Sequence, residues 1–121
     1  MKFLILFFVY LVAFEHIYFM ILEMFFWTKP KGLKAFGMKL EQAENSKVLA
    51  ANQGLYNGFL AAGLIWGAVS QLTHVIIFFL ICIVIAGAYG SYSTKQIKLF
   101  LFQGIPALIA LVLIWFTGNI F

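Results

Sequence analysis

A long apolar run, residues 3–27, contains three side chains that can carry charge near neutral pH: Glu15, His16 and Glu23. A membrane-spanning helix needs about 20 consecutive apolar residues, so this run is long enough to cross a bilayer. At about 100° per residue, the three side chains share one face of a helix. A carboxyl group at the centre of a membrane helix costs roughly 2.5–3.5 kcal/mol. We therefore expect this face to point into the protein and to mark a site.

The overall composition excludes an ordinary water-soluble domain. Hydrophobic residues make up 64% and charged residues 10% of the 121-residue chain, and the mean hydropathy is +1.03. Four apolar segments can be drawn, at residues 3–27, 48–69, 75–92 and 97–117. They leave room for a single membrane domain, residues 1–121. We expect an all-α bundle of four transmembrane helices.

The lysines predict the orientation of this bundle. Six of them lie between the first and second segments or between the third and fourth, a seventh, Lys98, lies at the start of the fourth segment, and only Lys2 lies on the other side. Cytoplasmic loops carry an excess of basic residues, so loops 28–47 and 93–96 are expected in the cytoplasm and both termini outside. The lysines have no interleaved aromatic platform, and we expect no nucleic-acid partner. With Cys82 as the single cysteine, a disulfide framework within the chain is excluded.

A second set of polar side chains lies at one depth when the four segments are aligned by helix rise. We expect these side chains, in the cytoplasmic half of the bundle, to form a pocket that opens inward. The side chains at this depth are Glu23, Asn52, Gln53, Tyr56, Asn57, Tyr89 and Gln103. Trp27 lies on the polar face of the first helix and is added to them. The predicted ligand-binding residues are Trp27, Asn52, Gln53, Tyr56, Asn57, Tyr89 and Gln103. Polar side chains in membrane bundles also bond helices to one another, so a purely structural role is the alternative.

Glu15, His16 and Glu23 are the candidate catalytic residues. His16 beside Glu15 fits a proton relay, a general base or a haem ligand, and a buried Glu23 could act as a neutral acid. The alternative for each is a structural hydrogen bond to a neighbouring helix. His16 and Glu23 are about 10 Å apart along the helix, too far to share one small ion, so we expect no metal site. Haem needs only one axial histidine, and His16 is a candidate for it.

Two glycine pairs predict close approach of helices. Gly54 and Gly58 form one GxxxG pattern, and Gly63 and Gly67 form a second. One pair is expected to pack within the bundle and the other to be available to a second subunit. We therefore expect a homo-oligomer.

The motifs resemble those of the bacterial family called domain of unknown function 1304. The resemblance covers essentially the whole chain and rests on residues 51–58 (ANQGLYNG), 86–90 (AGAYG) and 103–107 (QGIPA), together with Glu15-His16, Glu23-Met24 and Trp27. It implies a small four-helix protein of the bacterial inner membrane. It implies no established reaction.

Three classes of function follow from these observations. The first is an intramembrane binder of a lipophilic small molecule or haem, or an isomerase-type enzyme acting on such a molecule. The second is a small oligomeric carrier that uses the carboxyl groups as protonation switches. The third is a structural subunit whose polar residues hold helices together. The lipid bilayer is a partner in all three, and whether the chain is an enzyme stays open.

Overall fold

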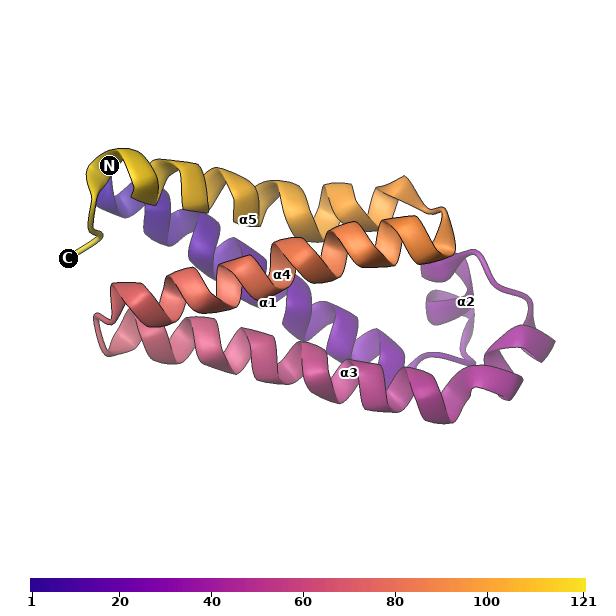
Figure 1. Ribbon diagram of the computed structural model, residues 1–121. Helices are drawn as coiled ribbons and strands as arrows, with labels where there is room; N and C mark the ends of the chain where they lie inside the picture. Colours follow the sequence, from indigo (N-terminus) through magenta and orange to yellow (C-terminus); the bar gives the residue numbers. More distant parts are fainter. The chain divides into compact units, whose positions relative to one another are not determined.

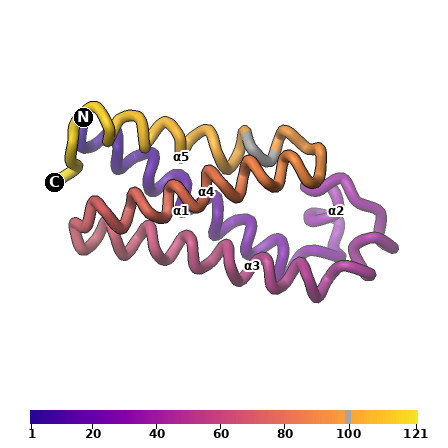
Figure 2. Tube along the Cα trace, viewed as in Figure 1, coloured from indigo at the N-terminus to yellow at the C-terminus, as the bar shows by residue number. Residues whose placement is uncertain are grey.

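The computed structural model describes residues 1–98 and 101–121 (Figure 2). The described part of the chain forms five helices, drawn in Figure 1. Their bounds are α1 Lys2–Phe25, α2 Pro30–Phe36, α3 Leu40–Val69, α4 Thr73–Thr94 and α5 Ile97–Thr117. All regular structure in the described residues is helical, which confirms the all-α prediction.

The extra helix, α2, lies in segment 28–47, where we predicted a loop. Pro30 occupies the first turn of α2, where its missing N–H costs nothing. Gly37 ends the helix in the left-handed conformation, with φ of +61°, and its N–H donates to the carbonyl of Leu33. The Lys-Pro-Lys-Gly sequence therefore begins a new helix after α1 has ended at Phe25.

Among the described residues, two helices are long and apolar enough to cross a membrane, α1 and α4. In α5 the corresponding apolar helix, Leu101–Thr117, is shorter. α3 has 30 residues, and at 1.5 Å per residue it is about 45 Å long. It begins eight residues before the apolar segment that starts at residue 48, and Glu41 in its first turn complements the helix dipole.

Contacts divide the chain into two compact groups of residues. The large group comprises residues 1–15 and 60–121, and the small group comprises residues 16–59. α1 and α3 each contribute one part to both groups. The small group contains the end of α1, all of α2 and the first part of α3.

In the large group, α4 and α5 run antiparallel and side by side (Figure 1). Glycines allow their close approach, because a Cβ atom at Gly87 would lie 3.4 Å from the backbone nitrogen of Gly104. The C-terminal segment turns back onto the start of α4, where Thr73 Oγ1 donates to Asn119 Oδ1 at 2.5 Å. Side chains from both helices are buried: Ile76, Leu80, Ile83, Ala107, Ala110 and Ile114.

The contact at Gly87 limits the size of the side chain that this position can hold between α4 and α5. Gly87→Ala should change stability by less than about 1 kcal/mol, because a methyl group there makes an ordinary contact and alanine favours the helix. Gly87→Leu should cost about 1–3 kcal/mol by forcing the helices apart. Thermal unfolding of both variants in detergent checks this. Equal unfolding midpoints for the two variants would show that α4 and α5 do not pack at Gly87.

Both GxxxG pairs pack inside the chain. In the small group, a Cβ atom at Gly54 would lie 2.7 Å from Met24 Cγ, and one at Gly58 would lie 2.7 Å from Met20 Sδ. In the large group, Gly63 and Gly67 pack in the same way: against Phe79 and Ile76, respectively. The glycine pattern thus explains packing within one chain, and the homo-oligomer stays a prediction.

Candidate functional site

Three polar side chains are buried in the small group: His16, Glu23 and Asn57. Their exposed fractions are 0%, 2% and 6%, respectively. His16 and Glu23 come from α1, and Asn57 comes from α3. A buried polar group is costly unless it is hydrogen-bonded, so the bonding of these side chains decides what they can do.

Glu23 and Asn57 are bonded to each other. Asn57 Nδ2 donates to Glu23 Oε1 at 2.5 Å. Gly54 and Gly58 lie on either side of Asn57 in the sequence, and their contacts with α1 bring the amide within reach of the carboxyl group. The side chain of Gln53 also lies near this carboxyl group. Glu23 Oε2 is buried, and among the described residues no donor reaches it with hydrogen-bond geometry.

Glu23 lines a groove between α1 and α3. The groove has a volume of about 370 Å³, within the range of small-molecule sites. Its walls combine apolar and polar side chains, which suits a ligand with one polar end. The lining residues are Glu23, Met24, Phe25, Trp27, Thr28, Lys47, Val48, Ala51 and Asn52.

Trp27 is held in the groove by two contacts. Its Nε1 donates to Ser46 Oγ at 3.1 Å, and the Ser46 hydroxyl donates to the carbonyl of Gln42 at 2.7 Å. The Trp27 ring also packs on Phe36 of α2, with ring centroids 4.9 Å apart. The short helix that the sequence did not predict therefore supports one wall of the groove.

Charge is arranged with a carboxyl group inside the groove and an ammonium group at its exposed side. Lys47 lines the groove, and its side chain is 59% exposed. Its Nζ lies 3.2 Å from Glu44 Oε2, one turn earlier on α3. This exposed pair contributes little to stability and leaves Lys47 free to move toward a bound group.

The structure brings five of the predicted site residues of this group together, one of them Gln53, whose side chain lies near the Glu23 carboxyl group. Glu23, Trp27 and Asn52 line the groove, and Asn57 holds Glu23. The Asn52 amide donates to the carbonyl of Val48 in its own helix, at 2.9 Å. Tyr56 is 62% exposed and packs on Phe59 rather than lining the groove.

The remaining predicted site residues, His16, Glu15, Tyr89 and Gln103, do not line this groove. His16 is fully buried, and its ring lies edge-on to Phe19 at 5.9 Å. In the large group, Glu15 is partly buried, and Tyr89 is 70% exposed. Gln103 lies beside Gly87 at the α4–α5 contact. Within the described residues no three His, Cys, Asp or Glu side chains gather to hold a metal ion. The catalytic roles of Glu15, His16 and Glu23 stay predictions, as does haem ligation by His16.

Several lining residues were missed from sequence, above all Lys47, which we interpreted as a topology signal. Lys47, Val48, Ala51 and Asn52 follow the spacing i, i+1, i+4, i+5, which places them on one side of α3. From that spacing, Lys47 could have been predicted to lie on the same side of the helix as Asn52. Met24 was missed because one apolar side chain among many carries no signal of its own.

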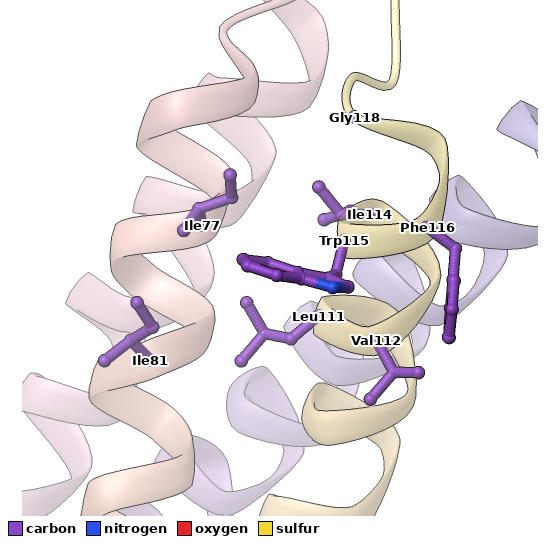
Figure 3. A pocket seen from close by; sticks show the side chains of 8 residues that line it. All are labelled: Ile77, Ile81, Leu111, Val112, Ile114, Trp115, Phe116 and Gly118. Atoms are coloured by element: carbon purple, nitrogen blue, oxygen red, sulfur yellow. The ribbon is translucent and has the colours of Figure 1, made fainter.

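A second groove lies in the large group, between α4 and α5 (Figure 3). Its volume is about 890 Å³, and the Trp115 ring extends toward Ile77 of α4. The other lining side chains are aliphatic or phenyl groups, so only the Trp115 indole N–H could orient a polar ligand. The groove between α1 and α3 is therefore the better candidate site.

Comparisons with known proteins agree with the motifs. Residues 10–115 match the family described as "Protein of unknown function (DUF1304)". The chain is 37% identical over 106 residues to "Uncharacterized protein YpaA" of Lactococcus lactis subsp. lactis (strain IL1403), an alignment that covers 84% of this chain and 88% of that protein. No solved structure matches the chain. The predicted family is confirmed, and the chain belongs to the DUF1304 family.

Proposed function

We propose that this chain is a four-span protein of the bacterial inner membrane whose α1–α3 groove binds the polar end of a lipophilic small molecule. One observation carries the proposal. Glu23 is a buried carboxyl group that lines a groove with largely apolar walls. Asn57 donates to one of its oxygens, and no donor in the described part of the chain reaches the other with hydrogen-bond geometry. A purely structural pair would satisfy both oxygens within the protein.

The membrane placement follows from the helices and the lysines. α1 and α4 have the length and composition of spans, and α3 and α5 carry the other two apolar segments. The lysines of segment 28–47 and of the α4–α5 turn support a cytoplasmic location for those ends, with both termini outside. Glu23 lies two residues before the end of α1, so the groove opens near the cytoplasmic surface.

The chemistry of the groove selects a ligand with a hydrogen-bond donor. An amine or hydroxyl group would complete the bonding of Glu23 Oε2, while Phe25 and Val48 pack on the apolar body. Because Oε2 is buried, a donor reaches it only when a lining side chain moves. Met24 has the flexible side chain suited to that movement. Catalysis, haem binding and proton-coupled transport are predictions from the sequence that this proposal does not need.

Fluorescence of Trp27 can test the proposal. Trp66→Phe/Trp115→Phe leaves Trp27 as the single tryptophan, and both replaced residues are exposed. In this background we expect saturable changes with decylamine and decanol and none with decane. Glu23→Gln should weaken decylamine binding about tenfold, because a hydrogen bond to a charged group becomes a neutral one.

Glu41→Gln is the matched control, because Glu41 is an exposed residue of α3 outside the groove. It should leave decylamine binding unchanged. Equal responses to decylamine and decane, or equal affinities in the wild-type and Glu23→Gln proteins, would refute a donor-binding groove.

A further inference from the structure

The helix α2 is fixed tightly against the end of α1. A Cβ atom at Gly32 would lie 2.0 Å from the backbone oxygen of Phe26, so the two backbones touch at a glycine. Phe36 of α2 packs on Trp27. The backbone of α2, which carries Lys31 and Lys34, is therefore held beside the end of α1, unlike the backbone of an extended loop.

Lys31 reaches back along α1. Its Nζ lies over the ring of Tyr18, 5.7 Å from the centroid, in the geometry of a cation–π contact. Tyr18 precedes the end of α1 by seven residues, about 10 Å along the helix axis. The ion pair found among the described residues is Lys47–Glu44, so Lys31 has no carboxylate partner there. An ammonium group is thus held beside a membrane-spanning helix with its charge uncompensated.

An exposed apolar stripe lies on α1 in the same region. Tyr18, Ile21 and Phe25 are 47%, 37% and 65% exposed, and their spacing of i, i+3, i+7 places them on one face. A cation at one side of an apolar stripe matches a phospholipid, whose phosphate is charged and whose acyl chains are apolar. Segment 28–47 has five lysines and two glutamates, which adds a net positive charge around Lys31.

We propose that Lys31, held over Tyr18, binds the phosphate of an anionic phospholipid whose acyl chain lies along Tyr18, Ile21 and Phe25. The inference rests on the proposed membrane placement of α1 but not on ligand binding in the groove. Anionic headgroups attract lysines close to the membrane surface, and an ordered lysine loses less freedom on binding than a mobile one.

The test uses the full chain in nanodiscs that contain equal amounts of phosphatidylglycerol and phosphatidylcholine. Native mass spectrometry then counts the lipids that stay bound after release. The wild-type protein should retain phosphatidylglycerol in preference to phosphatidylcholine, and Lys31→Gln should lower that preference about fivefold. Tyr18→Leu should lower it as well, whereas Tyr18→Phe keeps the ring and should preserve it.

Lys98→Gln is the matched control, because Lys98 is an exposed lysine at the start of α5. Equal losses in Lys31→Gln and Lys98→Gln would overturn the proposed site and leave only a general attraction to charge.

Extraction of membranes with alkaline carbonate distinguishes failure of the lipid site from failure of the proposed membrane placement. If the chain is released, the membrane placement fails; if it stays but shows no lipid preference, only the lipid site fails.

Discussion

Asn57→Leu is expected to destabilise the folded chain by about 1–3 kcal/mol, because it leaves the buried carboxyl group of Glu23 without its hydrogen-bond donor. Glu23→Gln should cost less, because an amide oxygen can still accept from Asn57. Unfolding in detergent, followed by circular dichroism, measures both variants.

The double variant Glu23→Leu/Asn57→Leu separates structure from function. Removing both partners removes the unpaired group, so the double variant should be more stable than Asn57→Leu alone. It should also fail to bind decylamine, since the acceptor is gone. A double variant that is no more stable than Asn57→Leu would show that the two side chains do not form the pair described here.

Gly32→Ala is expected to release α2 from α1. The new Cβ atom would meet the backbone oxygen of Phe26 at 2.0 Å, and backbone cannot yield as a flexible side chain does. Overpacking costs about 1–3 kcal/mol, so the undocked population should rise by roughly fivefold or more. Trypsin should then cleave faster after the lysines of α2, Lys31 and Lys34.

Gly90→Ala is the control for this change, because a Cβ atom at Gly90 meets nothing within 4 Å. It should leave cleavage in segment 28–47 unaltered. In the protein whose single tryptophan is Trp27, Gly32→Ala should also shift Trp27 emission to longer wavelength, because Phe36 no longer covers the ring. Unchanged cleavage and emission would show that α2 is not held at Gly32.

Much of the site follows from the pattern of residues along single helices. Glu23 could be assigned to an inward face, because a carboxyl group in an apolar run is too costly to leave in lipid. Asn57 could be predicted to lie at the same depth in the membrane as Glu23, because the rise per residue of a helix is constant. The burial of both side chains agrees with that reasoning.

Other parts of the fold and of the site depend on contacts between helices, which the pattern of residues along one helix does not predict. Tyr56 shares a depth with Glu23 but packs on Phe59, since depth does not determine the direction of a side chain. The helix α2 was missed because Lys-Pro-Lys-Gly is also typical of a turn, and its docking depends on the contact between Gly32 and Phe26. Lys47 was assigned to topology alone, although a lysine near a membrane surface can serve both purposes.

The most direct test of the groove is a high-resolution structure of the full chain in lipid with decylamine present, together with an absorption spectrum of the same sample. The proposal predicts non-protein density beside Met24, with the amine near Glu23 Oε2. A groove that stays closed, with Glu23 and Asn57 bonded only to each other, would contradict it. A Soret band with density at His16 would contradict it too, by placing the ligand at the histidine instead.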